Sequence, residues 1–476
     1  MQGIKLKKYF SRNLKLISIL TILALMVGCT TAPASPEEMT QSLNKESIDI
    51  TNTIRIIEEL SSEDFDGRLT GTKGNELTVE YIENYFKKIG LDNPTGIEGY
   101  RQSYDQKVLL NESKPMIAIK DGMGNITKEF GFLSDYRKMA IFEDVKIQGE
   151  ATAEMIIINN FDEINNDDKA LDGKILLISN NVIAGNPTGG YDILQKVLDL
   201  EQQVEGIIVN LDNRYGEHYL VSTSLRYINT KLGEGFNNKT GPIMAYFHDE
   251  AFEELTQAAM DGNTLHMKVD YSYKDEVAHN VIGVIPGSDE ESQETLIIAA
   301  HLDHVGNNQD GTYNPGALDN ASGTAAIMEI ARMLKSEELQ PKKTIIFIAF
   351  NGEEQYLCGS TYYVRNSLYP LANTTVINLD MVGSKEVIPL TIGGSSNNLN
   401  KDLYDIATEL GIDALISQDI ASDQRPFNDV GLEATTLIHL DTNKIHTKFD
   451  TIENVDKDRL ANIIKLVLSY IEKTAY

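Results

Sequence analysis

Residues 295–306 read TLIIAAHLDHVG, residues 316–323 read GALDNASG and residues 344–355 read TIIFIAFNGEEQ, and these three segments decide the fold. The first and third begin with a short apolar run and end in acidic or imidazole side chains. Between them, residues 321–334 carry apolar side chains at helical spacing. Apolar runs that alternate with a helix are typical of parallel strands buried on both faces. The stretch therefore predicts a strand–helix–strand unit.

Four predicted strands are each followed by side chains that can bind a metal ion. The strands are 295–300, 344–350, 374–379 and 434–440, and the side chains that follow them are His301 with Asp303, Glu353 with Glu354, Asp380, and His446. In open α/β sheets, ligands bind beyond the carboxyl ends of the strands. The predicted fold class is α/β, with a mixed, mostly parallel central sheet flanked by helices and a functional site at one sheet edge.

Length and charge limit the classes of protein that this chain can represent. Its 476 residues suffice for about three domains. The 71 acidic residues against 42 basic ones give a net charge of −29, which argues against nucleic acid as a partner. Two cysteines are too few for a disulfide framework.

The N-terminus has the composition of an export signal. Basic residues and no acids occupy residues 1–15, an apolar segment covers 16–27, and Gly28-Cys29 follows. The sequence Leu25–Cys29 resembles a bacterial lipobox, in which the cysteine is lipidated. We expect residues 1–28 to be removed, the remaining chain to lie outside the cytoplasm, and Cys29 to anchor it to the cell membrane through the tether 29–47. The alternative is an ordinary cleaved signal peptide.

The rest of the chain divides into a main frame and an insertion. Residues 48–134 contain two predicted helices around a glycine-rich loop and a strand at 104–110. Residues 135–273 read as a β-rich insertion, with strands at 155–158, 174–178, 206–209 and 267–269 and helices near 191–203 and 250–260. The main sheet resumes at 279–286 within the final part, 274–476.

Five side chains suit a divalent metal: His301, Asp319, Glu354, Asp380 and His446. A set of imidazoles and carboxylates without thiolate is typical of a hydrolytic zinc site, because structural zinc sites favour cysteine. A single catalytic zinc needs three protein ligands, whereas five fit two metals that share one carboxylate. His304 and His439 are weaker candidates, expected to have structural or supporting roles, and Cys358 is expected to be a packing residue.

The Glu353-Glu354 pair suggests that the two glutamates have different roles. Adjacent residues at a strand end point in different directions, so one can bind metal while the other faces a water that the metals activate. A carboxylate beside such a water can serve as general base. Asp303 lies two residues from His301, where it can accept the second ring N–H of a ligating imidazole.

The motifs AAHLDHVG, GALDNASG, NGEEQYLCGS, NLDMVG and IHTKFDT resemble, in order and spacing, those of the co-catalytic di-zinc aminopeptidases. That group includes aminopeptidase Y, aminopeptidase S and bacterial leucyl aminopeptidases, and the insertion resembles a protease-associated domain. The resemblance implies two zinc ions per chain and peptide substrates with a free N-terminus. One zinc would be completed by His301 and Asp380 and the other by Glu354 and His446, with Asp319 bridging them.

The same resemblance implies further roles. Glu353 would be the general base acting on the metal-bridged water, Asp303 would orient His301, and the Asp319–Asn320 peptide would be cis. Relatives commonly have histidine in place of Gln424. The loop at 68–73 and the inserted domain are expected to wall the site, leaving room for a chain end but not for a strand that passes through. Alternative functions are a carboxypeptidase or a glutaminyl cyclase on the same fold, or a non-catalytic binding lipoprotein.

Overall fold

The peptidase-like part is built on a sheet whose central strands are parallel. In the computed structural model, the described residues are 43–138, 146–164, 169–184, 197, 203–210, 241–289, 294–337 and 340–476. The strand order across this part is β14-β13-β15-β12-β10-β11-β9. The bounds are β9 (Thr264–Ile285), β10 (Thr295–His301), β11 (Thr344–Phe350), β12 (Thr374–Asp380), β13 (Leu390–Gly393), β14 (Ala414–Ser417) and β15 (Glu433–Ile438).

Parallel pairing brings the carboxyl ends of four strands to one edge. β10 pairs in parallel with β11 and β12, and β12 pairs in parallel with β15. β9 and β13 run antiparallel to their neighbours β11 and β15. The predicted mixed, mostly parallel α/β fold is confirmed, and all four strands that were expected to present metal-binding residues are present.

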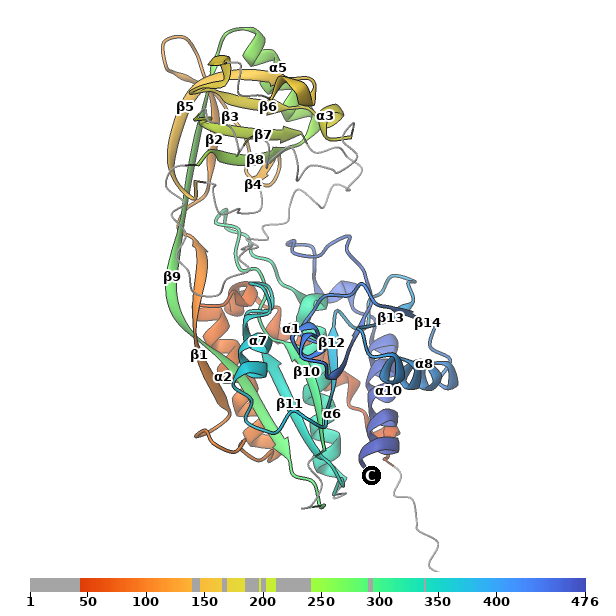
Figure 1. Cartoon of the computed structure of the whole chain (residues 1–476). Helices are drawn as coiled ribbons and strands as arrows, with labels where there is room; N and C mark the ends of the chain where they lie inside the picture. Colours follow the sequence, from red (N-terminus) through yellow and green to blue (C-terminus); the bar gives the residue numbers. More distant parts are fainter. Residues whose placement is uncertain are drawn as a thin grey trace, which may run out of the picture. The chain divides into compact units, whose positions relative to one another are not determined.

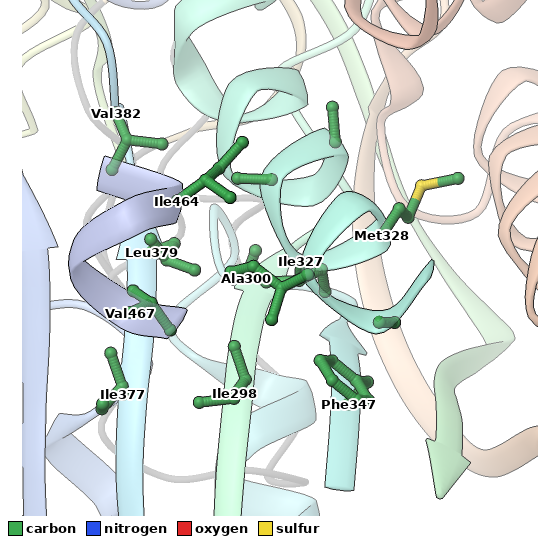
Figure 2. Packing of buried hydrophobic residues seen from close by; sticks show 14 of the residues in the cluster. Ile298, Ala300, Ile327, Met328, Phe347, Ile377, Leu379, Val382, Ile464 and Val467 are labelled. Carbon is green, nitrogen blue, oxygen red and sulfur yellow. The ribbon is translucent and has the colours of Figure 1, made fainter. Parts of the chain in front are cut away.

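Both faces of this sheet are covered, which explains why its strands are apolar without alternation. On one face, α6 (Gly323–Ser336) and α10 (Lys457–Ala475) pack with α1 (Ile50–Leu60), α2 (Lys73–Ile89) and α8 (Asn397–Glu409). Figure 2 shows Ile298 and Phe347 of the sheet facing Ile327 of α6, with Val467 of α10 beside Ile377. On the other face, Tyr363 of α7 (Cys358–Arg365) and Phe427 of α9 (Arg425–Asp429) cover the strands.

Local sequence signals account for the ends of the long helices. The Thr72 hydroxyl accepts the main-chain N–H of Asn75 at the start of α2, and Gly90 ends this helix with a φ of +77°. Asp456 accepts the N–H groups of two residues in the first turn of α10. Such capping satisfies backbone donors that a helix start leaves without partners. The two helices predicted between residues 48 and 91 are therefore α1 and α2.

A single strand of 22 residues, β9, belongs to both β-sheet regions. Its C-terminal half pairs with β1 (Arg101–Asn111) and β11, and its N-terminal half pairs with β2 (Met116–Lys120) and β5 (Gln148–Ile158). Figure 1 shows β1 lying along β9. The boundary expected at 273/274 therefore falls inside a strand and not in a linker, because β1 is paired with β9 on both sides of it.

The β-rich segment has its own buried core. Strands β5, β6 (Ile175–Ile178), β7 (Gly206–Asn210) and β8 (Ile243–Phe247) are neighbours in parallel, β4 (Tyr136–Lys138) closes the edge, and β3 (Ile126–Glu129) pairs with β2. α5 (Asp249–Met260) packs through Phe252 and Leu255. The strands expected at 155–158, 174–178 and 206–209 and the helix at 250–260 are present. The helix expected at 191–203 lies almost wholly outside the described residues.

The export signal, the tether up to Ser42 and Cys29 also lie outside the described residues. Within the described part of the chain, no helix combines the length and the hydrophobicity that a membrane crossing requires.

Candidate metal centre

Five side chains named from the sequence meet at the carboxyl edge of the parallel strands. His301 and Asp380 are the last residues of β10 and β12. Glu354 follows β11, Asp319 lies in the short turn η7 (Ala317–Ser322) before α6, and His446 lies in the loop after β15. All five are at least nine-tenths buried.

Their ligand atoms form two overlapping groups. His301, Asp319 and Asp380 make one group, and Asp319, Glu354 and His446 with His304 make the other, with one ligand atom of each residue within 4.8 Å of the others in its group. In the first group, His301 Nε2 lies 3.4 Å from both Asp319 Oδ1 and Asp380 Oδ1. The structure thus gathers all five predicted ligands.

Asp319 belongs to both groups through different oxygen atoms. Its Oδ1 faces His301, whereas its Oδ2 lies 3.1 Å from His446 Nε2. The peptide bond between Asp319 and Asn320 is cis, as the family resemblance implies. The Asn320 side chain holds the turn against β12, since its Nδ2 donates to the carbonyl of Leu379 at 2.8 Å and its Oδ1 accepts the N–H of Met381 at 3.2 Å.

The ionisation of the site is dominated by mutual attraction. Burial favours the neutral acids, but His446 and His304 hold the pKa of Glu354 below its ordinary value. Likewise, His301 and His446 hold the pKa of Asp319 well below its usual range in spite of burial. Burial disfavours a charged His301, yet Asp380 and the neighbouring Glu353 raise its pKa well above 6.5. The carboxylates of Glu354 and Asp319 therefore remain charged and favour positive charge between them.

These residues fit divalent metal ions. Carboxylate oxygens and imidazole nitrogens converge in a buried space, and Asp319 Oδ2 is buried yet accepts no hydrogen bond from the residues that the structure describes. Buried acceptors without donors are costly unless a cation satisfies them. The nitrogen and oxygen donors without thiolate suit catalytic zinc.

Glu353 stands apart from both ligand groups. It is only half-buried, and its pKa is raised well above the ordinary value by loss of solvation, partly offset by His301, and by the nearby carboxylates of Glu354 and Asp380. A carboxylate with a raised pKa is suited to accepting and returning a proton near neutral pH. This placement agrees with the role of base expected for Glu353.

Asp303 faces His301 through its main-chain carbonyl and not, as the sequence suggested, through its carboxylate. His301 Nδ1 lies 3.2 Å from the main-chain carbonyl of Asp303 and 3.8 Å from its Oδ1. The Asp303 carboxylate accepts the main-chain N–H groups of Glu353 at 3.1 Å and Glu354 at 3.2 Å. One residue therefore connects the ends of β10 and β11, because its main chain faces the imidazole and its side chain holds the acidic pair.

The weaker candidates separate into two kinds. His304 Nδ1 lies 3.0 Å from Glu354 Oε1 and 3.7 Å from Asp319 Oδ2. His304 therefore contacts the predicted ligands directly, although the sequence indicated it only as a weaker candidate. His439 accepts the N–H of Gly383 through Nδ1 at 3.1 Å and belongs to neither group. Cys358 is buried, and its thiol donates to the carbonyl of Gln355, as expected for a packing residue.

Residues 422–424 contact the site through Asp380 and contact β15 through Thr436. The Ser422 hydroxyl donates to Asp380 Oδ2 at 2.7 Å. Gln424, where the family resemblance implies histidine, accepts the Thr436 hydroxyl at 2.7 Å and donates to the carbonyl of Ile420 at 2.7 Å. Asp423 is fully buried, and burial raises its pKa to about 7. Gln424 is therefore a structural residue here.

Two residues beneath the site were not individually assigned a function from the sequence. Arg68 is almost fully buried, and the expectation that the loop at 68–73 walls the site stays a prediction. Asp450 is also buried and lies in the motif IHTKFDT. The glycines around Arg68 signalled a tight loop, but nothing local indicated which segments it would contact.

A two-group cluster of imidazoles and carboxylates at the carboxyl edge of an α/β sheet defines the class of metal-dependent hydrolases. Residues 280–471 match Peptidase family M28. Aminopeptidase YwaD of Bacillus subtilis (strain 168) is 33% identical over 248 residues, which are 49% of this chain and 52% of that protein. A probable leucine aminopeptidase of Arthroderma benhamiae is 27% identical over 240 residues, 47% of this chain and 65% of that protein. The chain thus spans about half the length of YwaD, and the expected resemblance is confirmed for this part.

Solved structures share the fold over most of the chain. An aminopeptidase from Aneurinibacillus sp. strain AM-1 superposes with a TM-score of 0.65 at 22% identity, covering 90% of this chain and 95% of that one. A zinc aminopeptidase from Bacillus subtilis gives a TM-score of 0.64 at 22% identity, covering 90% and 96%. At this identity the likeness establishes the fold, while the assignment of the inserted segment as a protease-associated domain stays a prediction.

Proposed function

We propose that this protein is a zinc-dependent aminopeptidase that removes N-terminal residues from peptides. The observation that carries the proposal is the pair of ligand groups that share Asp319. The M28 match of residues 280–471 and the likeness to named aminopeptidases support it. Because the matched relatives are covered only in part, the activity of the whole protein is an inference.

We propose two zinc ions per chain. His301 and Asp380 would hold one ion and Glu354 and His446 the other, with Asp319 contributing one oxygen to each. The two ions would polarise the scissile carbonyl and lower the pKa of a water molecule towards neutrality. His304 would support the second ion through its contact with Glu354.

The remaining chemistry belongs to side chains of this protein. Glu353 takes a proton from the attacking water as the new carbon–oxygen bond forms. It then returns this proton to the leaving amine as the peptide carbon–nitrogen bond breaks, so that the carboxylate is regenerated. The Asp303 carboxylate fixes the main chain of Glu353 and Glu354. The side chain of the proposed base, Glu353, and that of the proposed ligand, Glu354, can therefore keep different directions.

The charge around the site favours a substrate amine over a substrate carboxylate. The carboxylates of Glu354 and Asp380 both lie close to that of Asp319, and the pKa values of Asp319 and Glu354 are held low. The nearby cation, Arg68, donates to main-chain carbonyls and so does not offer its guanidinium to a substrate. This arrangement supports an aminopeptidase over a carboxypeptidase.

A pair of matched substrates tests the direction of attack. Leucine p-nitroanilide should be cleaved on the order of 10²-fold faster or more than its N-acetylated twin, because blocking the amine removes a group that the acidic site recognises. An N-acetylated dipeptide with a free carboxylate serves as the carboxypeptidase probe. Equal rates for the two anilides, or preferred cleavage of the dipeptide, would exclude the aminopeptidase while leaving a two-metal hydrolase.

We also propose that the protein is exported and lipid-anchored through Cys29, with its catalytic part outside the cytoplasm. This proposal is supported by the leader at residues 1–28 and by the lipobox-like sequence before Cys29. A diacylated cysteine buries enough methylene groups for stable anchoring.

A further inference from the structure

The loop Asp66–Arg68 approaches the segments that carry the metal-binding residues very closely. Gly67 has a φ of +70°, and a Cβ atom at this position would lie 2.6 Å from the carbonyl oxygen of Gly306 and 2.7 Å from that of Asn314. The Gly67 carbonyl accepts the N–H of Gly306 at 2.9 Å. A glycine is therefore required, since only its missing side chain allows the loop to contact the segment after His304.

Arg68, the next residue, sends its guanidinium beneath the site. Its Nε donates to the carbonyl of Leu302 at 3.0 Å, between His301 and Asp303. Its Nη atoms donate to the carbonyls of Leu60, Pro315 and Gly316 at 2.7 to 2.8 Å, and Nη2 lies 3.4 Å from the carbonyl of Asp319. No carboxylate of a described residue forms an ion pair with it. A planar fork with five N–H groups suits such a set of fixed acceptors, and lysine cannot reproduce it.

Asp450 holds the same turn by accepting hydrogen bonds from its main-chain N–H groups. Its Oδ1 and Oδ2 accept the N–H groups of Leu318 at 3.0 Å and Asp319 at 2.9 Å, and its own carbonyl accepts the N–H of Ala317 at 3.1 Å. Arg68 binds carbonyls of this turn, and Asp450 binds its amides. Together they leave the main chain around Asp319 little freedom to turn.

We infer that Arg68 and Asp450 are positioning residues, which set the main chain of residues 315–319 so that Asp319 presents one oxygen to each metal-ligand group. The inference rests on the proposed function, because it assigns these residues to the same site. The side-chain hydrogen bonds of both residues described above go to main-chain groups, so we assign neither a contact with substrate. Their effect is on metal binding, since a ligand held in place loses less freedom when the ion binds.

The charge of Arg68 makes the inference sharply testable. A buried cation near Asp319 repels a divalent metal, so a residue that contributed only charge would weaken zinc binding, and its removal would strengthen it. If Arg68 instead positions the turn, its substitution should weaken zinc binding, because the turn that carries Asp319 becomes free to move. Burial lowers the pKa of Arg68 only to about 10, so that the cation persists at neutral pH.

The experiment measures zinc affinity in the full chain by competition with a chromophoric chelator. Arg68→Lys removes donors to the turn, and Asp450→Glu keeps the carboxyl group but displaces it by one methylene. Both should weaken zinc binding by about 10- to 100-fold, the range found when partners of metal ligands are altered. If the buried lysine of Arg68→Lys lost its proton, a charge that repels zinc would disappear and zinc binding should become tighter. Weaker zinc binding would therefore still show that the turn is no longer held in position.

The matched control is Arg332→Lys. Arg332 lies on α6 and donates to the buried Glu329 at 2.7 Å and to the carbonyl of Ser47 at 3.0 Å, neither of which is a predicted ligand. This substitution can lower the melting temperature of the metal-free protein but should leave zinc affinity within about twofold of wild type. A melting curve for each variant identifies the folded fraction, so loss of stability is distinguished from loss of affinity.

Each outcome is decisive. Weaker zinc binding by folded Arg68→Lys and Asp450→Glu, with an unchanged control, supports the inference. Wild-type affinity or tighter binding in both variants overturns it and leaves the proposed function intact. If Arg68→Lys fails to fold, Asp450→Glu decides alone. Wild-type protein that binds no zinc would instead overturn the proposed function.

Discussion

The carboxylate of Asp303 accepts the main-chain N–H of Glu353 with 3.1 Å between Oδ1 and nitrogen. Its second oxygen accepts the N–H of Glu354 at 3.2 Å. The two glutamates share this anchor, yet only Glu354 joins a ligand group. The relationship explains how neighbouring residues of the same type can have different functions, because the main chain between them is fixed while their side chains diverge.

The first prediction concerns Glu353→Gln. This variant should keep the fold and the bound zinc but lose on the order of 10²–10⁴ in kcat, because the amide cannot accept the proton of the attacking water. Zinc content by elemental analysis and steady-state kinetics on leucine p-nitroanilide provide the two measurements.

The control for that prediction is Glu354→Gln, an identical change one residue later. It should lower zinc content or affinity, since it removes a charged oxygen that lies 3.0 Å from His446. If both variants lost metal equally, or both retained it with equal loss of kcat, the assignment of separate roles would be wrong.

The second prediction concerns zinc stoichiometry. The purified protein should contain two zinc ions per chain, lose activity to chelators and recover it with zinc or cobalt. Asp319→Ala should reduce the affinity for both ions, because its two oxygens face different ligand groups. A single tight ion whose occupancy is unaffected by Asp319→Ala would refute the bridging role.

The third prediction concerns pH dependence at His439. Burial, with a contribution from Arg459, lowers the pKa of His439 from 6.5 to about 3. The unfolded chain therefore binds a proton at His439 more readily than the folded chain does. The contribution of the neutral imidazole to the unfolding free energy is complete above pH 6.5 and is lost as the pH falls towards 3. This group should account for about 2 kcal/mol of the loss in unfolding free energy between pH 7 and pH 5.

His439→Asn tests this assignment. An asparagine oxygen can still accept the N–H of Gly383, but the side chain does not titrate. Urea unfolding of the chelator-treated protein at several pH values should show a shallower acid dependence for the variant. Identical slopes between pH 7 and pH 5 would show that another group is responsible.

The fourth prediction concerns Cys29. Mass spectrometry of the protein from its native membrane should find an N-terminal peptide that begins at Cys29 and carries a lipid. Cys29→Ser should release the protein from the membrane fraction without changing the kcat of the released enzyme. An unmodified N-terminus at another residue would contradict the anchor.

The sequence by itself determined the chemistry of the site. Short apolar runs dictate buried strands, and the polar residues that follow them must lie at the strand ends whatever the rest of the chain does. His301 and Asp380 could be assigned for this reason, since the strand places each of them directly. Asp319 and His446 followed from residue type and from the family resemblance.

Only the tertiary structure decided which distant residues support that site. Arg68 and Asp319 are separated by 251 residues, and their contact depends on main-chain carbonyls, which every sequence contains and no pattern marks. The same holds for the amides that Asp303 and Asp450 accept. The continuity of β9 across the expected boundary was likewise hidden, because pairing with β1 on both sides, and not local composition, keeps residues 273 and 274 extended.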